Sequence, residues 1–268
     1  MTIVLIALFF YLLAGGLLVQ QGNTQTGKGR WLGFGLAAVM LHTAYHAWVI
    51  WQTPGGADMH FFAALSLVGL GMAGLTSLAA VRGQLAALAL IVYPVAALLL
   101  LGYHLYGHAP SPALGWRLET HAWLALLAYA TLTLVALLAL MLRIQEKALR
   151  TRQASTWSRR LPPLNELETL LFRSLGAGFI LLSLTLVTGV LFVDDLLAQK
   201  LVHKTVLSVL SWIVFGVLLL GRWRWGWRGK KAVRLVLIAS VLLLLAFFGS
   251  KAAIELVFGQ ALVRRPFL

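Results

Sequence analysis

The sequence predicts an all-α, polytopic membrane protein built from a bundle of about eight transmembrane helices. Hydrophobic residues make up 60% of the 268 residues and charged residues only 11%, a composition with more apolar surface than one soluble core can bury. The apolar residues are concentrated in runs close to the ~20 residues that cross ~30 Å of hydrocarbon. Because lipid offers the backbone no hydrogen-bonding partner, helices are the expected form of these runs.

The spans follow one another as a single membrane domain covering residues 1–268. The first four are predicted at residues 2–20, 31–52, 60–81 and 84–106, and the next four at 120–142, 172–193, 201–220 and 232–258. The first run has no Lys or Arg before it and lacks a small-residue cleavage pattern, so it is interpreted as a retained helix. The polar stretch 145–167, between the fifth and sixth spans, is interpreted as a cytoplasmic connector.

The start of the sixth helix carries a local signal of its own. Asn165 is expected to cap this helix, with Glu166 and Glu168 in its first turn, because an amide oxygen and negative charges both favour a helix N-terminus.

Lys and Arg set the orientation because they fall in every second connection, at residues 28–30, 82, 143–160 and 222–231. These connections are predicted to be cytoplasmic, which places both termini on the periplasmic side of a bacterial inner membrane. The net charge of +14 then faces anionic membrane lipid, so a nucleic-acid partner is not expected.

Two motifs have a structural interpretation. The glycines of a G-x-G-x-x-G pattern lie inside an apolar span, where small residues let helices approach closely; packing roles are expected for Gly69, Gly71 and Gly74, and also for Gly33, Gly35, Gly176 and Gly178. The Trp- and Arg-rich run 222–231 is expected to anchor the cytoplasmic surface. An alternative is that this basic face recruits a cytoplasmic partner, which would make the protein a membrane scaffold.

All seven histidines fall at or beyond the middle of spans, toward the predicted outer ends. His42 and His46 lie within one apolar run, and the others flank runs: His60, His104, His108, His121 and His203. Imidazoles gathered in one slab of a membrane indicate a metal or haem, because a polar ring near the bilayer centre is costly and by default functional.

Two histidine pairs have the i, i+4 spacing that places both rings on one helix face. His42 with His46, and His104 with His108, suit a tetrahedral metal ion, although neither pair can occupy opposite axial positions of one haem iron. With Asp58 or Glu255 completing a site, these pairs give an alternative function in divalent metal transport.

His121 opens the fifth span one helical turn after Arg117. An outer histidine beside an arginine suits an exposed haem, with imidazole for the iron and guanidinium for a propionate. His203, beside Lys204, starts the seventh span in a similar way. The chain has no cysteine, which excludes covalent thioether attachment of haem to it. Nothing resembles a nucleophile elbow, a phosphate loop or a carboxylate dyad, so catalysis is not expected.

Several segments carry a family resemblance. Residues 121–130, the segment 161–164 with Glu168, residues 185–189, and residues 226–231 with 247–249 resemble the helices and connector of the cytochrome c assembly (CcsA-type) family of haem-handling membrane proteins. The short chain is most similar to the eight-helix YpjD/HemX-like subgroup. The resemblance covers about residues 110–258 well and the first four spans loosely.

The resemblance implies that His121 is a haem ligand and that His42, or failing that His46, is a ligand within the membrane. The chain departs from the family's full haem-delivering members, since residues 192–204 contain no tryptophan and residues 249–268 no histidine. His203 is a candidate replacement for the missing outer histidine.

Taken with the resemblance, the leading hypothesis is an inner-membrane protein that binds haem b through axial His121 and His42. It would assist cytochrome assembly or haem-linked regulation, with cytochrome c maturation or haem-synthesis proteins as partners.

Overall fold

The computed structural model describes residues 1–21, 29–52, 59–83, 86–106, 115–151, 161–192 and 202–246. Within these ranges all regular secondary structure is helical, which confirms the predicted fold class. The helices are α1 (Thr2–Gln21), α2 (Arg30–Gln52), α3 (Phe61–Val81), α4 (Ala86–Tyr106), α5 (Trp116–Thr151), α6 (Leu164–Phe192), α7 (Val202–Trp225) and α8 (Gly229–Leu244).

Seven of these helices, α1 to α7, are long and apolar enough to cross a membrane. The described part of α8 has 16 residues and is followed by a short π-helical turn. Large apolar side chains cover the outside of the bundle, as at Phe9, Leu98 and Val190, each at least 60% exposed. An outer surface of this kind is stable only against lipid.

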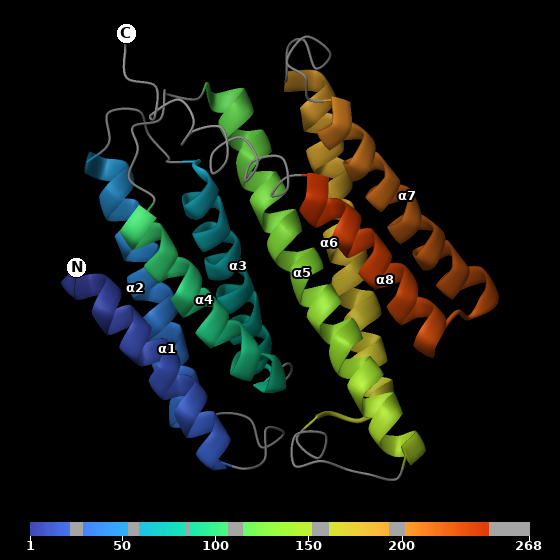
Figure 1. The fold of residues 1–268 in the computed structure, drawn as a ribbon, viewed down its shortest axis with the longest axis horizontal. Coiled ribbons are helices and arrows are strands. Elements are labelled where there is room, and N and C mark those ends of the chain that lie inside the picture. The colour runs from blue at the N-terminus through green and yellow to red at the C-terminus, as the bar shows by residue number, and fades with distance from the viewer. Residues whose placement is uncertain are drawn as a thin grey trace, which may run out of the picture.

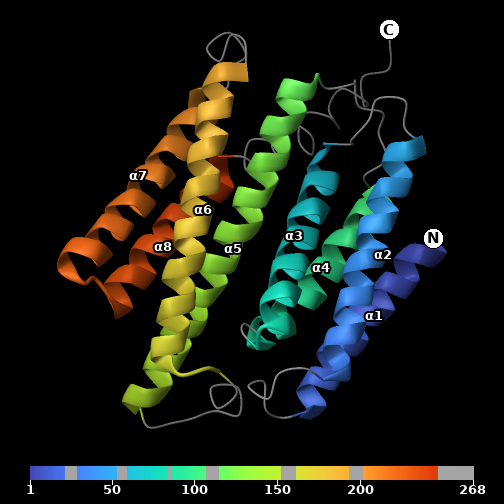
Figure 2. The ribbon, with the colours of Figure 1, turned by 180° about the vertical axis from the view of Figure 1, so that it is seen from behind.

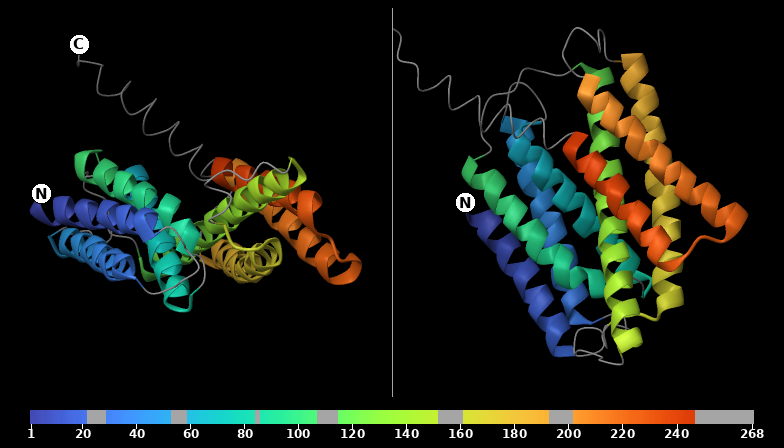
Figure 3. Two further views of the ribbon diagram at one scale, coloured as in Figure 1. Left: turned by 90° about the horizontal axis from the view of Figure 1, so that it is seen from below. Right: turned by 45° about the vertical axis from the view of Figure 1, so that its right-hand side comes forward.

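The helices form two groups that meet along α3 and α5. Helices α1, α2, α3 and α4 pack with one another, and α5, α6, α7 and α8 do the same; the groups lie on opposite sides of the molecule in Figures 1 and 2. The view from below in Figure 3 separates them again. Helix α5 lies at the centre and packs against α3, α6 and α8.

Consecutive helices alternate in direction (Figure 1), so every second helix end lies on the same face. The histidines in the described part of the chain lie toward one face, and exposed Trp51, Tyr106 and Trp116 mark that end. The other face carries exposed Trp223 and Trp225 and most described cations, at Arg30, Arg82, Arg143, Lys147, Arg150, Arg222, Arg224, Arg228, Lys230 and Lys231. Aromatic residues at both ends match the two interfaces of a bilayer.

Helices α5 and α6 are longer than the sequence-based expectation. Helix α5 runs from Trp116 to Thr151 and α6 starts at Leu164, so both helices extend into the predicted connector. Asn165 is therefore the second residue of α6 and not its cap. The backbone N–H groups of Glu166 and Leu167 instead donate to the carbonyl of Pro163, at 3.0 and 3.1 Å.

The predicted glycine contacts are confirmed in part. A methyl group added to Gly71 would overlap Ala130 of α5, and one added to Gly178 would overlap Leu132. Gly35 is equally tight against the ring of Tyr93. Gly33 and Gly176 face open space, so the packing role expected for these two positions is wrong.

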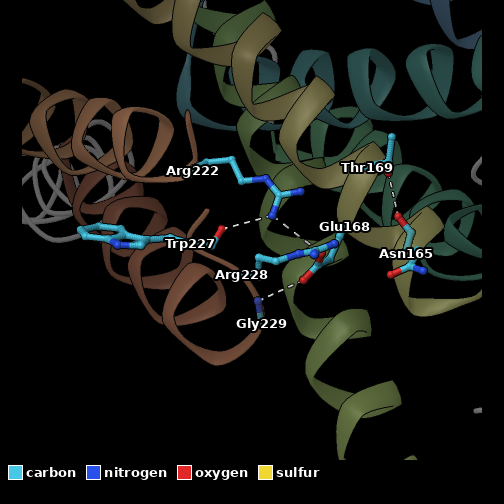
Figure 4. A network of polar contacts seen from close by, with 7 residues as sticks. All are labelled: Asn165, Glu168, Thr169, Arg222, Trp227, Arg228 and Gly229. Atoms are coloured by element: carbon cyan, nitrogen blue, oxygen red, sulfur yellow. Dashed lines mark hydrogen bonds and ion pairs between the residues drawn. The ribbon is translucent and has the colours of Figure 1, made fainter. Parts of the chain in front are cut away.

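The run 222–231 forms a tight α7–α8 turn that is locked to the start of α6 (Figure 4). Gly226 and Gly229 adopt φ values of 63° and 54°, a conformation that glycine enters without steric cost. The carboxylate of Glu168 accepts hydrogen bonds from Nε of Arg228 at 2.9 Å and from the backbone N–H of Gly229 at 3.1 Å. Glu168 therefore caps α8, whereas the sequence indicated a role in its own helix.

Candidate histidine sites

The described histidines gather toward one face of the bundle, as the sequence indicated. His42 and His46 lie in the second half of α2, His104 lies in the last turn of α4, and His121 lies in the first turns of α5. Their side chains make two separate sites, one among α1 to α4 and one between α5 and α6.

The first site is a buried histidine pair formed by His42 and His46. Nδ1 of His42 lies 3.2 Å from the hydroxyl of Tyr11 on α1, and its Nε2 lies 2.9 Å from Oγ of Ser66 on α3. Nε2 of His46 lies 3.0 Å from the same Ser66 oxygen. Exposure is 0% for His42 and 5% for His46, so three helices enclose the pair.

Aromatic rings extend this site toward the face at which α2 and α4 end. The ring of His46 stacks on Tyr103 of α4, with centroids 4.7 Å apart and an interplanar angle of 4°. The hydroxyl of Tyr45 lies 2.8 Å from Nδ1 of His104. The helix face that carries the pair is therefore lined by aromatic residues from α2 and α4.

Ser66 links the buried histidine pair through a single hydroxyl proton. Because that proton can serve only one ring at a time, at least one of the two Nε2 atoms must donate to the oxygen of Ser66. Both nitrogens of His42 are engaged, one with Tyr11 and one with Ser66. His42 can bind a metal only if one of these hydrogen bonds breaks.

The second site is His121, a half-buried residue that faces α6. Its Nδ1 lies 3.0 Å from Oγ1 of Thr188, and its Cε1 would lie 3.2 Å from a Cβ at Gly189. The ring also hydrogen-bonds the backbone of Thr185 on the same helix. Residues Thr185 and Thr188 therefore hold the imidazole against α6.

Arg117 lies one helical turn outward from His121, on the same face of α5. Its side chain is exposed, and its guanidinium carbon lies 5.5 Å from the ring centroid of Trp116. Trp116 in turn contacts Phe192 at the end of α6, with centroids 5.9 Å apart. The start of α5 and the end of α6 thus form a site, here called the α5–α6 mouth, with a cation and two aromatic rings beside the imidazole.

The structure does not connect the two sites. The described contacts of His42 lie on α1 and α3, and those of His121 lie on α6. The pairing of His42 and His121 on one iron, expected from the family resemblance, therefore stays a prediction.

The divalent-metal alternative has limited support in the described part of the chain. No group of three or more histidine, aspartate and glutamate side chains there could hold a metal ion. His108, Asp58 and Glu255, which the alternative requires, lie outside the described residues. His203 is the second residue of α7, and its side chain is also outside the described part.

A cavity of about 470 Å³ lies between α3, α5 and α6, toward the face with the cations. Its lining is mainly aliphatic, with Arg82, Thr131 and Ser174 as polar residues. No histidine is among the residues that line it. This cavity therefore offers no axial ligand for an iron.

The sequence-based reasoning missed three residues that hold the histidines in place. Tyr11 and Ser66 position His42, and Thr188 positions His121. Ser66 is a hydroxyl residue in a largely apolar helix that also contains Thr76 and Ser77, which is a signal the sequence contained. Tyr11 and Thr188 gave no local signal, because their partners lie 31 and 67 residues away.

Comparison with known proteins gives matches over much of the chain. A family model described as Cytochrome C assembly protein matches residues 31–257, well over half of the chain. The chain is 36% identical over 137 residues to the inner membrane protein YpjD of Escherichia coli strain K12, covering 51% of this chain and 52% of that protein.

Two further relatives were found. The chain is 38% identical over 158 residues to an uncharacterized 28.8 kDa protein in the nifR3-like 5' region of Azospirillum brasilense, covering 56% and 58% of the two chains. It is 31% identical over 134 residues to Protein HemX of Brevibacillus brevis, covering 49% of each. The chain thus spans about half the length of the curated relatives it matches. No solved structure matches it.

Proposed function

Because the chain belongs to the cytochrome c assembly protein family, we propose that it binds b-type haem at the outer end of its helix bundle through His121. Family membership makes it a haem- or cytochrome-related protein, and its spans make it a multi-pass protein of the inner membrane. The proposed role is haem handling, either in cytochrome assembly or in haem-linked regulation. Binding rather than catalysis is the proposed activity.

The residues at the α5–α6 mouth fit a haem. His121 has Nδ1 held by Thr188, and its ring also hydrogen-bonds the backbone of Thr185. Arg117, one turn outward, is exposed and supplies a charge that suits a propionate. Trp116 and Phe192 offer apolar surface for a flat aromatic ligand. A bound haem would supply a redox-active iron.

The state of the His121 ring is the observation that carries this proposal. A metal-binding histidine is commonly held by hydrogen bonds from neighbouring groups, and Thr185 and Thr188 of α6 hold His121 in this way. His42 is engaged at both nitrogens, so we assign the first ligand to His121. His42 or His46 remains the candidate ligand within the membrane, and His203 is the candidate second ligand at the outer end.

The partners in this proposal are haem, membrane lipid and proteins of cytochrome c maturation or haem synthesis. The scaffold alternative is less well supported, because Arg222 and Arg228 of the basic run contact Glu168 within the chain. Trp223, Trp225 and Lys230 remain exposed on that face, where the bilayer interface accounts for them.

The test is an absorption spectrum, oxidised and reduced, of detergent-purified protein titrated with hemin. We expect a Soret band and sharp reduced bands in the native chain, and their loss in His121→Ala. His60→Ala is the matched control, because His60 lies on the same face just before α3, and it should keep the spectrum. An unchanged spectrum in His121→Ala would contradict the assignment.

A companion variant, His42→Ala, separates the two histidine sites. If His42 is an axial ligand to the same iron, its loss changes the reduced bands as strongly as the loss of His121. If it is not, the bands stay and only the stability of the α1–α4 group falls.

A further inference from the structure

The contact between His121 and α6 involves two consecutive residues, Thr188 and Gly189. Oγ1 of Thr188 lies 3.0 Å from Nδ1 of His121. Gly189 leaves the space into which the edge of the ring fits, because a Cβ there would lie 3.2 Å from Cε1 and 3.7 Å from Nδ1. The backbone of Thr185 also hydrogen-bonds the ring, which is therefore held by polar contacts to α6 and along one edge.

The hydroxyl proton of Thr188 is already used within its own helix. Oγ1 lies 2.9 Å from the carbonyl oxygen of Leu184 and 3.1 Å from that of Thr185. A threonine hydroxyl in a helix commonly donates to the carbonyl one turn earlier. Since a hydroxyl has only one proton, the remaining role of Oγ1 toward His121 is that of an acceptor.

We infer that Thr188 and Gly189 are positioning residues that hold His121 in the tautomer with its proton on Nδ1. Nδ1–H then donates to Oγ1 of Thr188, and Nε2 carries the lone pair. That lone pair is what an iron requires from a neutral imidazole, and the hydrogen bond at the other nitrogen fixes the plane of the ring. The consequence for haem rests on the proposed function, whereas the tautomer itself does not.

The tautomer can be read without haem, by nitrogen-15 NMR of histidine-labelled protein in detergent micelles. The signals that disappear in His121→Ala belong to His121. We expect its Nδ1 to show the shift of a protonated nitrogen and its Nε2 that of an unprotonated one. In Thr188→Val, which keeps the branched shape and removes the hydroxyl, the two tautomers should mix. A proton on Nε2 in the native chain would overturn the inference.

Hemin titration then measures what the positioning contributes. Loss of a residue that orients a metal ligand typically weakens metal affinity by about 10- to 100-fold, so Thr188→Val should weaken hemin affinity by at least about 10-fold. Thr188→Ser, which restores the hydroxyl, should recover it. The matched control is Thr185→Val, one turn earlier on α6, whose hydroxyl bonds the carbonyl of Leu181.

Gly189→Ala tests the contact between Gly189 and the edge of the His121 ring. The added methyl group would push the ring of His121 away from α6 by a few tenths of an ångström, so hemin affinity should fall and the Soret maximum should shift. Gly176→Ala is the control, because that position on the same helix faces open space. Native-like affinity in Gly189→Ala would show that the ring is not seated there.

The outcomes separate this inference from the proposed function. If His121→Ala abolishes hemin binding while Thr188→Val binds like the native chain, the positioning role is wrong and haem ligation by His121 stands. If His121→Ala binds hemin normally, haem ligation by His121 is wrong. The tautomer of His121 is then decided by the NMR measurement alone. Equal losses in Thr188→Ser and Thr188→Val would overturn the role of the hydroxyl.

Discussion

Replacing Glu168 by alanine should loosen the end of the second helix group (α5 to α8) at which the α7–α8 turn lies. The carboxylate is buried at the start of α6 and is the acceptor for both Arg228 and the first backbone N–H of α8 (Figure 4). A second guanidinium, that of Arg222, lies 4.0 Å from the carboxylate. The variant leaves Gly229 without an acceptor and two arginines without their counter-charge.

The size of the effect follows from these contacts. A hydrogen bond to a charged group contributes about 1.5–3 kcal/mol, and loss of a side-chain cap at a helix N-terminus costs about 0.5–2 kcal/mol. The side chain of Arg228 is 58% exposed, so water replaces part of what that residue loses. We therefore expect a loss of about 2–4 kcal/mol in the free energy of unfolding.

The assay is thermal unfolding in detergent, with Glu166→Ala as the matched control. Glu166 lies in the same turn of α6 but is exposed, so its loss should cost little. For a chain of this size, each kcal/mol shifts the midpoint by roughly 2–4 °C, which predicts a drop of about 10 °C for Glu168→Ala. Glu168→Gln should fall between the two, because its amide oxygen still accepts one hydrogen bond.

Equal melting of Glu168→Ala and Glu166→Ala would refute this reasoning. The α7–α8 turn would then be held by its own backbone, and the burial of Glu168 would have no energetic role. A Glu168→Gln variant as unstable as the alanine variant would instead show that the charge, and not the accepting oxygen, is what matters.

Two further predictions concern the α1–α4 group, and both take their control variant from α2. Gly35→Ala should destabilise the protein by about 1–3 kcal/mol, because its methyl group overlaps the ring of Tyr93, an overpacking cost; Gly33→Ala, in open space, should be neutral or slightly stabilising, as read from thermal midpoints. Ser66→Ala should cost about 1–3 kcal/mol by leaving the buried histidine pair without its shared partner. Thr43→Ala, which removes an exposed hydroxyl from α2, should melt like the native protein.

The sequence predicted the helices well because a transmembrane span is a local property. Each span is an apolar run whose length the bilayer sets, and the runs were visible one by one. The ends of α5 and α6 were less predictable. Residues 143–151 are polar and charged, so hydropathy ends the span there, yet they are good helix formers and the helix continues past the membrane.

Tertiary partners explain what the sequence did not show. Glu168 follows Asn165 closely enough to indicate a cap on its own helix, but its carboxylate reaches a backbone N–H 61 residues away. The i, i+4 spacing of His42 and His46 correctly placed both rings on one face. It could not show that Ser66, on another helix, occupies the point where the two nitrogens converge.

The position of α3 bears on how two histidines could share one haem. Helix α3 packs against both α2 and α5, and it supplies Ser66 to the buried histidine pair. His121 faces away from it, toward α6.

An iron bound to His42 and His121 together would need His42 to leave Tyr11 or Ser66. Each broken hydrogen bond leaves a buried polar group without a partner, which costs about 1–3 kcal/mol unless a new partner is found. Binding at His121 breaks no contact of the buried histidine pair, and this ring is only half-buried. The outer site is therefore the one that can accept haem first, and the buried histidine pair can follow only if binding supplies the energy to open it.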